Sequence, residues 1–538
     1  MVVERIMSQN GAQRTGSFPR LLSGSRPESR SRSSCGFERP IPEDTGRPGG
    51  VRSERMARLT VAENADDRIY RQFLLRDTAC NGKFLAGVLS TGIYCLPSCP
   101  ARRPRRENVR FFRTPEQAEA SGLRPCRRCR PDWFHRGAAW HESLYEVTVA
   151  RLRNEPAGFR DIGAIARAAG VSRTALNDLF REHAHESPGS FLRRVRAEHA
   201  ARLIRQGATP ADAAAAAGFE SASAFHEQFA ARMAMTPGAY AALTGARDFR
   251  LKLPPRYRVR EVLDFYGRDE QSVSERVNSD SLRKALLIDG APSLVEVLFR
   301  EGVAECRVDG ADGYAGHRAA SRMLGLDSDA VPFERQFASD PEFGGLIGRQ
   351  RGLRIPLTPA PWEAMAWAIM GQQISVKAAV SLRRALIGAY GLPHSCGLRA
   401  HPAAEALVAC TADDLRGLGF SRSKAEYLLA AAAAVASGQL PLDKWASARG
   451  DVSALRAARA MGAVRGIGPW TVQYVFLRAF GYADCLPAGD AGLAQGLELL
   501  RGQRPDESSI RAMMARFAPY RSLATCHVWA SLKGDRVE

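Results

Sequence analysis

Four cysteines of this chain stand in two close pairs, Cys95 with Cys99 and Cys126 with Cys129. Two close thiol pairs on separate loops can close a tetrahedral shell around Zn²⁺. Four arginines follow the first pair at once: Arg102, Arg103, Arg105 and Arg106. Positive charge favours thiolate over thiol and attracts phosphate. The pattern therefore predicts one zinc site, held by all four cysteines, on a surface that approaches nucleic acid.

About residues 65–135 resemble the N-terminal zinc domain of the Ada adaptive-response family, on the strength of "DTACNGKFLAGVLSTGIYCLPSCPARRPRRENVRFF" and "AEASGLRPCRRCRPD". The resemblance implies that Cys95 is both a zinc ligand and the acceptor of a methyl group from a DNA phosphotriester. A metal-bound thiolate stays deprotonated at neutral pH, and a phosphotriester methyl is an electrophile. Methylation would remove negative charge beside the DNA backbone, so DNA affinity should rise irreversibly. A purely structural zinc is the alternative, because spacing alone does not establish reactivity.

The next segment predicts two helix-turn-helix units. A turn at Gly170 separates two helices in "RDIGAIARAAGVSRTALNDLFREHAHESPGSFL", and a second copy turns at Gly218. The tandem copies, closed by "SPGSF" and "TPGAY", resemble an AraC-type DNA-binding domain over about residues 150–240. The second helix of each copy is then expected to enter the major groove. The residues expected to contact DNA there are Ser172, Arg173, Asn177, Ser221, Ser223 and His226.

Two glycines and one aspartate carry the chemistry predicted for the C-terminal half. Gly466 and Gly468 lie between two helical stretches in "MGAVRGIGPWTVQYVFLRAF", where a backbone without Cβ can approach a phosphate closely. Asp490 follows in "LPAGDAGL", a loop that enters a helix. A carboxylate in such a place can stabilise positive charge on a sugar, or can simply cap the helix N-terminus.

Hairpin, loop and aspartate together resemble the helix-hairpin-helix base-excision glycosylases, above all the 3-methyladenine DNA glycosylase II (AlkA) type, over about residues 248–538. The resemblance implies that Asp490 is catalytic and that an alkali metal ion can bind at the hairpin. Trp470 stands where strand-cleaving relatives have a lysine, which predicts a monofunctional enzyme. Electron-rich pocket rings would favour cationic alkylated purines. The resemblance implies that the flipped base is bound in a pocket by Trp470, Tyr474 and Trp529. It also implies that Gln372 or Gln373 fills the space that this base leaves in the duplex.

The charge of the whole chain points to the same kind of partner. The 538 residues carry a formal net charge of +19, and this excess favours a polyanion, most often nucleic acid. No apolar run approaches the roughly 20 residues that span a bilayer, and the N-terminus lacks the apolar segment of a secretory signal. We expect a monomer in the cytoplasm, associated with the nucleoid, that binds alkylated and promoter double-stranded DNA and contacts RNA polymerase.

Composition and periodicity predict a multidomain chain that is mainly α with α/β parts. Residues 1–57 are rich in Ser, Gly, Pro and Arg and are expected to be disordered. Four domains should follow: an Ada-type zinc-binding methyl-acceptor module at 58–140, an AraC-type tandem helix-turn-helix domain at 141–245, a small antiparallel α+β domain at 246–335, and a helix-hairpin-helix glycosylase domain at 336–538.

These features together indicate an alkylation-damage response protein. A monofunctional glycosylase that excises alkylated purines of the 3-methyladenine class would be fused to a sequence-specific transcriptional regulator, which accepts methyl groups from phosphotriesters in a suicidal transfer. One alternative is a transcription factor whose glycosylase-like half only binds DNA. Another is a repair enzyme whose front half only localises it.

Overall fold

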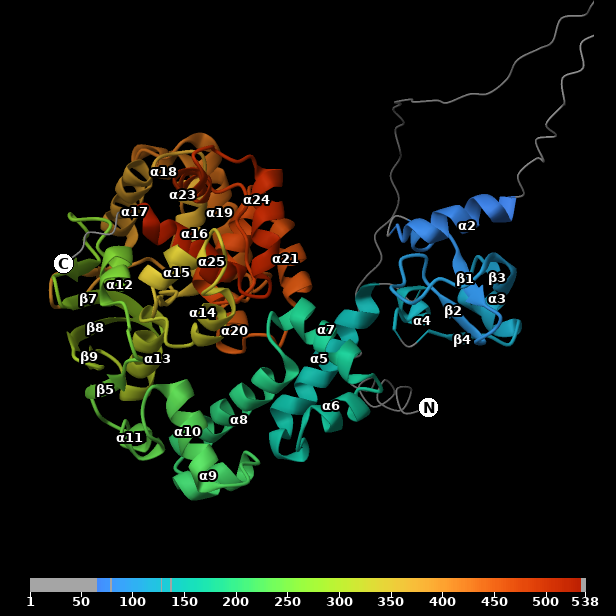
Figure 1. Ribbon diagram of the computed structural model, residues 1–538. Coiled ribbons are helices and arrows are strands. Elements are labelled where there is room, and N and C mark those ends of the chain that lie inside the picture. The colour runs from blue at the N-terminus through green and yellow to red at the C-terminus, as the bar shows by residue number, and fades with distance from the viewer. Residues whose placement is uncertain (1–64, 78–79, 127, 136–137, 534–538) are drawn as a thin grey trace, which may run out of the picture. The chain divides into compact units, whose positions relative to one another are not determined.

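The computed structural model describes residues 65–77, 80–126, 128–135 and 138–533 (Figure 1). Residues 1–57, for which we predict disorder, lie outside the described residues. Helices dominate the described chain and two multistranded sheets accompany them, which confirms the predicted fold class. No helix in this part of the chain is both long and apolar enough to cross a membrane.

The cysteine-bearing region is a four-stranded sheet with the strand order β3-β1-β2-β4. Its pairs are antiparallel except that of β2 with β4, which is parallel. Cys95 ends β2 and Cys126 directly follows β4, so parallel pairing brings one cysteine of each pair to the same sheet edge. The elements are α2 (Ala65–Leu75), β1 (Leu85–Val88), β2 (Ile93–Cys95), η2 (Arg106–Asn108), β3 (Val109–Phe112), α3 (Pro115–Ala120), β4 (Arg124–Pro125) and α4 (Pro131–His135).

Seven α-helices and one short 3-10 helix form the described part of the tandem helix-turn-helix region. The turn glycines Gly170 and Gly218 have φ of +68° and +81°, a backbone conformation that side chains with a Cβ rarely adopt. Helix α8 contacts helices of both copies and joins them (Figure 1). The elements are α5 (Ala138–Asn154), η3 (Pro156–Gly158), α6 (Ile162–Ala168), α7 (Arg173–Ala184), α8 (Pro188–Arg205), α9 (Pro210–Ala216), α10 (Ala222–Met233) and α11 (Pro237–Ala241).

A five-stranded antiparallel sheet follows, with the strand order β5-β9-β8-β7-β6. Its core continues into the helix-turn-helix region, since Phe229 of α10 and Leu251 of β5 belong to one buried apolar cluster. This cluster spans the predicted domain boundary at residues 245 and 246. The elements are β5 (Asp248–Lys252), α12 (Val259–Tyr266), β6 (Glu275–Val277), β7 (Ser281–Ile288), β8 (Ala291–Arg300), β9 (Val303–Asp309) and α13 (Gly313–Met323).

The rest of the chain is a helical lobe around α16, whose residues are buried almost throughout. A helix that is apolar all round belongs at the centre of a large core. The elements are α14 (Val331–Phe337), α15 (Gly344–Arg349), α16 (Pro361–Gly371), α17 (Val376–Tyr390), β10 (Leu392–Pro393), β11 (Arg399–Ala400), η4 (Glu405–Leu407), α18 (Ala412–Gly417), α19 (Arg422–Ala436), α20 (Leu442–Ser447), α21 (Ala454–Gly462), α22 (Pro469–Val475), the π-helical turn η5 (Phe476–Phe480), α23 (Ala491–Arg501), α24 (Glu507–Met514), η6 (Ala515–Phe517) and α25 (Arg521–Ser531).

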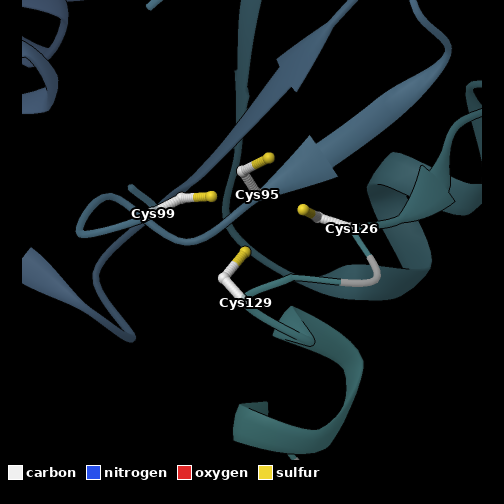
Figure 2. A group of neighbouring side chains, drawn as sticks. All are labelled: Cys95, Cys99, Cys126 and Cys129. Atoms are coloured by element: carbon white, nitrogen blue, oxygen red, sulfur yellow. The ribbon is translucent and has the colours of Figure 1, made fainter. Parts of the chain in front are cut away.

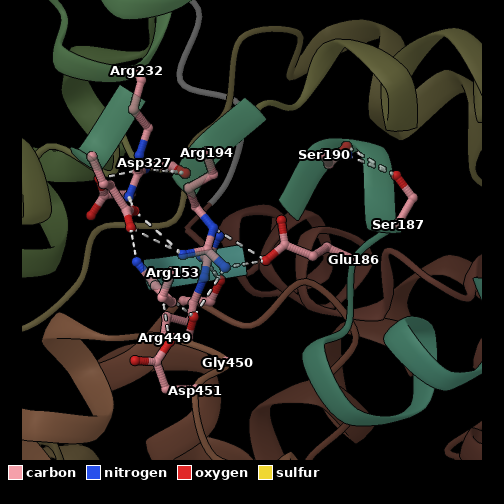
Figure 3. A network of polar contacts seen from close by, with 12 residues as sticks. Arg153, Glu186, Ser187, Ser190, Arg194, Arg232, Asp327, Arg449, Gly450 and Asp451 are labelled. Atoms are coloured by element: carbon pink, nitrogen blue, oxygen red, sulfur yellow. Dashed lines mark hydrogen bonds and ion pairs between the residues drawn. The ribbon is translucent and has the colours of Figure 1, made fainter. Parts of the chain in front are cut away.

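A buried polar network ties α5 and α8 to the loop before α21 (Figure 3). Arg194 of α8 is 6% exposed and donates to the carbonyl oxygen of Arg449 at 3.0 Å. Arg153 of α5 pairs with Asp451 at 2.6 Å. Both arginines also pair with Glu198, at 3.3 Å and 2.5 Å. Charges buried this deeply are tolerated only when each has opposite charge or hydrogen bonds around it.

Glu198 is the centre of this network. Burial raises the pKa of its carboxyl, but Arg194, Arg232 and Arg153 outweigh that effect and hold the pKa well below its usual range. A carboxyl whose folded pKa is depressed contributes stability above its unfolded pKa, about 4.3, and loses that contribution as the pH falls through the folded value.

Replacing Glu198 with Gln should therefore destabilise the protein by about 3 kcal/mol at pH 7, because three guanidinium groups lose their shared anion. Urea unfolding followed by tryptophan fluorescence measures this difference. It should shrink as the pH falls below about 4, because the carboxyl protonates there in the unfolded chain while it stays ionised in the folded protein. Glu301→Gln, in an exposed turn, is the control and should match the wild type. Equal stability of Glu198→Gln and wild type at pH 7 would contradict the assignment.

Candidate functional site

The four predicted zinc ligands converge on one point (Figure 2). The sulfur atoms of Cys95, Cys99, Cys126 and Cys129 all lie within 4.8 Å of one another. A tetrahedral site with Zn–S bonds of about 2.3 Å has S–S edges of about 3.8 Å, so this donor set fits zinc closely. Cys95, Cys99 and Cys126 are buried, and Cys129 is partly exposed.

The thiols of this cluster influence one another strongly. A hydrogen bond with Cys126 raises the pKa of Cys95, whereas a hydrogen bond with Cys129 lowers the pKa of Cys126. The backbone N–H of Leu96 donates to the sulfur of Cys129 at 3.3 Å. Such a donor withdraws charge from a thiolate, so Cys129 is a weaker nucleophile than its exposure alone would suggest.

The arginines after the first cysteine pair divide into two groups. Arg103 stacks on the Phe73 ring at 3.8 Å and donates to the carbonyl oxygen of Pro97 at 2.7 Å. Arg106 pairs with Asp67 at 2.8 Å. Arg103 therefore helps to hold the module together, whereas the ion pair of Arg106 lies at the surface, with Arg106 34% and Asp67 51% exposed. The exposed members of the predicted set are Arg102 and Arg105.

The structure places the six predicted base-contacting residues at the start of α7 and α10. Ser172 and Ser221 cap these helices, and their hydroxyl oxygens accept from the N–H of Ala175 and Ala224. Their first task is thus to start the helices. The side chains of Arg173, Ser223 and His226 are exposed, and that of Asn177 is half-buried.

Asp490 lies where three helices meet. Its carboxylate caps α23 by accepting from the N–H of Leu493 at 2.8 Å. It also accepts from the indole N–H of Trp529 at 2.8 Å and from that of Trp470 at 3.2 Å. The sequence left open whether Asp490 caps a helix or acts on a sugar. The structure shows the helix cap and places the same residue in the lining of a cleft, so capping does not exclude the second role.

Three predicted aromatic residues form a wall beside Asp490. Trp470 and Tyr474 stack with ring centroids 5.4 Å apart, and Trp529 lies 6.3 Å from Tyr474. All three line a cleft of about 2500 Å³ that also reaches the hairpin glycines. A cleft of this size admits a nucleotide together with the backbone that carries it.

The two hairpin glycines have different tasks. Gly466 has φ of +85°, and a Cβ there would lie 2.1 Å from the Tyr427 ring, so packing requires the glycine. Gly468 precedes α22, and a Cβ there would meet open space. The open backbone at Gly468 is the part of the hairpin that a phosphate can approach.

The two glutamines of the neighbouring loop also differ. Gln372 turns inward and donates to the carbonyl oxygen of Gly466 at 2.9 Å and to the Thr471 hydroxyl at 3.1 Å. Lys424 donates to the carbonyl oxygen of Gln372 and fixes the loop from below. Gln373 is exposed with φ of +55°, so it is the glutamine that projects from the loop.

Sequence reasoning missed several residues of the cleft. Phe265, Arg268, Trp367 and Arg478 line it together with Asp490. They come from α12, the residues after it, α16 and the π-helical turn, and they share no motif with the aspartate. Ile374, next to Gln373, is an exposed apolar side chain at the loop tip.

Three family models match this chain. They are the metal binding domain of Ada over residues 68–132, a helix-turn-helix domain over 165–242 and the HhH-GPD superfamily base excision DNA repair protein over 366–519. Fold and site thus define a DNA-damage protein that combines metal binding, helix-turn-helix and base-excision domains. The chain belongs to the family of the "Probable bifunctional transcriptional activator/DNA repair enzyme AlkA" of Mycobacterium tuberculosis, with which it is 30% identical over 491 residues, 87% of this chain and 96% of that protein.

Two further proteins resemble parts of the chain. The "Bifunctional transcriptional activator/DNA repair enzyme Ada" of Escherichia coli is 30% identical over 171 residues, which are 32% of this chain and 48% of that protein. The structure of a 3-methyladenine DNA-glycosylase from Archaeoglobus fulgidus superposes with a TM-score of 0.48 and 24% identity, covering 53% of this chain and 99% of that one. The predicted fusion of Ada-type and AlkA-type parts is confirmed by the family models and the bifunctional relatives.

Replacing Cys99 with Ala should lower the zinc content of the purified protein from about one atom per chain to well below one, because three thiolates do not close a structural tetrahedral site. Metal analysis after dialysis against a weak chelator measures the zinc content. Cys410→Ala, which changes a half-buried cysteine outside the cluster, is the matched control and should keep its zinc. Zinc retained in full by Cys99→Ala would exclude that residue as a ligand.

Proposed function

We propose that the chain protects DNA against alkylation through two chemical sites, a glycosylase cleft and a methyl-accepting zinc module. Family membership supports a repair glycosylase joined to a transcriptional regulator. The observation that carries the glycosylase assignment is the carboxylate of Asp490, held by two indole N–H groups at the edge of an aromatic cleft.

The cleft suits cleavage of a glycosidic bond. A damaged nucleotide leaves the duplex and its base enters between the aromatic side chains, while Gln373 fills the space it leaves. Alkylation at N3 or N7 makes the base a cationic leaving group, so the step needs little acid catalysis. Positive charge then builds on the sugar, and the Asp490 carboxylate stabilises it until water adds at C1′. An abasic site and a free purine of the 3-methyladenine class remain.

A monofunctional reaction follows from the amines near the cleft. Strand cleavage through a Schiff base needs an amine beside the sugar, and Trp470 occupies the position that supplies it in strand-cleaving relatives. Lys533 is the lysine that lines the cleft among the described residues, and its Nζ donates to the carbonyl oxygen of Asp264 at 3.1 Å and pairs with the Asp264 carboxylate at 3.4 Å. The Nζ of Lys424, on α19, donates to the carbonyl oxygens of Gln372 and Ile369 beneath the loop. Cleavage of the glycosidic bond alone is therefore expected.

The zinc module supplies the second activity. All four cysteines would hold Zn²⁺, which keeps the sulfur of Cys95 deprotonated at neutral pH. The Cys95 thiolate attacks the methyl carbon of a phosphotriester, a C–S bond forms, and the C–O bond breaks with its electron pair left on the phosphate oxygen. The products are S-methylcysteine and an ordinary phosphodiester. The sulfur cluster becomes less negative, so the module should bind DNA more tightly and activate transcription.

Several finer assignments complete the proposal. Arg102 and Arg105, the exposed arginines of this set, would contact phosphates near the zinc module, and α7 and α10 would enter the major groove at a promoter. Contact with RNA polymerase, a monomeric state, location at the nucleoid and an alkali metal ion at the hairpin stay predictions.

Replacing Asp490 with Asn should reduce release of 3-methyladenine and 7-methylguanine from methylated DNA by about 10²-fold or more, because the charge facing the sugar cation is lost. Chromatography of the released bases measures the rate. Asp506→Asn is the matched control, since Asp506 caps α24 in the way that Asp490 caps α23. Undiminished release by Asp490→Asn would favour the alternative in which the C-terminal half only binds DNA.

Incubating the protein with DNA that carries methyl phosphotriesters should transfer methyl groups to Cys95 and to no other member of the cluster. Peptide mass spectrometry locates the added methyl, and the same sample should bind its promoter more tightly than untreated protein, because anionic charge beside the backbone falls. A methyl on another cysteine would overturn the choice of acceptor. An unchanged promoter affinity would leave the front half as a localising module.

A further inference from the structure

Six arginines gather in a part of the cleft that is built neither by the hairpin nor by the aromatic wall. They come from two short segments, 256–260 between β5 and α12 and 349–354 at the end of α15. All six line the same cleft as Asp490. We name them the arginine patch: Arg256, Arg258, Arg260, Arg349, Arg351 and Arg354.

Contacts between the two segments make the patch one surface. A terminal N–H of Arg258 donates to the carbonyl oxygen of Arg349 at 3.0 Å, across 91 positions of sequence. Gly352 lies against the carbonyl oxygen of Arg256 so closely that a Cβ at residue 352 would lie 1.7 Å from that oxygen. The second segment therefore packs on the backbone of the first and fixes it.

The backbone of Arg256 is in an unusual conformation. Its φ is +59°, in the left-handed region that residues with a Cβ rarely adopt. Such a conformation persists only where the surrounding structure enforces it, and it occurs most often at functional sites. The close contact with Gly352 enforces it here, at an exposed residue of the cleft lining. This strain points to a ligand that the loop must meet.

The patch keeps positive charge that such a ligand can meet. Of the acidic groups beside it, Glu261 pairs with Arg258, and Asp264 pairs with a lysine at 3.4 Å. Arg256 and Arg351 are exposed, and no acidic side chain of the described residues pairs with either of them. Guanidinium groups bind phosphate oxygens well, because their planar fork of N–H donors matches two oxygens at once.

The position of the patch suits the backbone of a duplex whose nucleotide enters the cleft. Helix α12 runs from Val259, within the patch, to Tyr266, next to the cleft residue Phe265. Its eight residues span about 10 Å at a rise of ~1.5 Å per residue. Each strand of a duplex carries a phosphate every ~3.4 Å along the axis, so this distance corresponds to about three phosphates.

We propose that the arginine patch is a second phosphate-binding surface of the glycosylase half, which holds the DNA backbone a few nucleotides from the flipped base while the hairpin holds it elsewhere. This inference rests on the proposed glycosylase function. It adds the antiparallel sheet domain, which supplies residues 256–260, to the parts of the chain that touch DNA. Unstacking and unpairing a nucleotide costs free energy, and backbone contacts on the patch offset part of that cost.

Single-turnover release of 7-methylguanine from short methylated duplexes, followed at increasing protein concentration, tests the proposal. Arg256→Gln combined with Arg351→Gln should raise the protein concentration that gives the half-maximal rate by about tenfold, while the maximal rate falls far less. The slope of that concentration against salt, on logarithmic axes, should fall by about two, because two phosphate contacts are lost.

Two further double variants are the controls. Arg256→Lys combined with Arg351→Lys keeps both charges and should stay within about threefold of the wild type. Arg250→Gln combined with Arg307→Gln removes the same charge from the exposed sheet surface outside the cleft lining, and should change neither the concentration nor the salt slope.

The results separate the inference from the function on which it rests. Base release by the wild type, with an unchanged half-maximal concentration and salt slope in the glutamine variant of the patch, overturns the inference and leaves the glycosylase assignment intact. A lower maximal rate at an unchanged concentration shows that the two arginines support the cleft and do not bind DNA, and it too overturns the inference. Absence of base release by the wild type overturns the glycosylase assignment and the inference with it.

Discussion

The glycosylase that we propose depends on one constraint: the Asp490 carboxylate must be fixed in place while its charge stays available to the sugar. A salt bridge would fix it but would also cancel the charge. The structure instead uses neutral donors, the indole N–H groups of Trp470 and Trp529 and the backbone N–H of Leu493. Since these come from α22, α25 and α23, the same contacts join three helices beside the cleft.

The arginines beside the aromatic wall of the cleft are held in place by aromatic rings, not by hydrogen-bond donors. Arg268 and Arg478 are stacked on rings and kept off the carboxylate, so the cleft holds both signs without neutralising either. In the zinc module, Arg103 stacks on Phe73, whereas Arg102 and Arg105 are exposed.

Motifs that are contiguous in sequence were predictable. The cysteine pairs, the hairpin glycines and Asp490 each lie in a short segment whose residue types already restrict the chemistry. The broad fold class and its helical domains were predictable as well. Residues that are distant from these motifs in the sequence could not be predicted. Phe265 and Arg268 precede Asp490 by more than 200 positions, and only tertiary packing puts them in its cleft. Gln372 and Gln373 are identical in type, and backbone conformation alone directs one inward and the other outward.

The apolar cluster that holds Phe229 together with Leu251 has an evolutionary implication. A gene divided between the codons for residues 245 and 246 would encode two polypeptides, each with an apolar surface exposed to water. Each separate half would need polar side chains on that face to stay soluble, so the two halves of this chain depend on being joined. Inheritance of the pair as a single reading frame is then hard to undo.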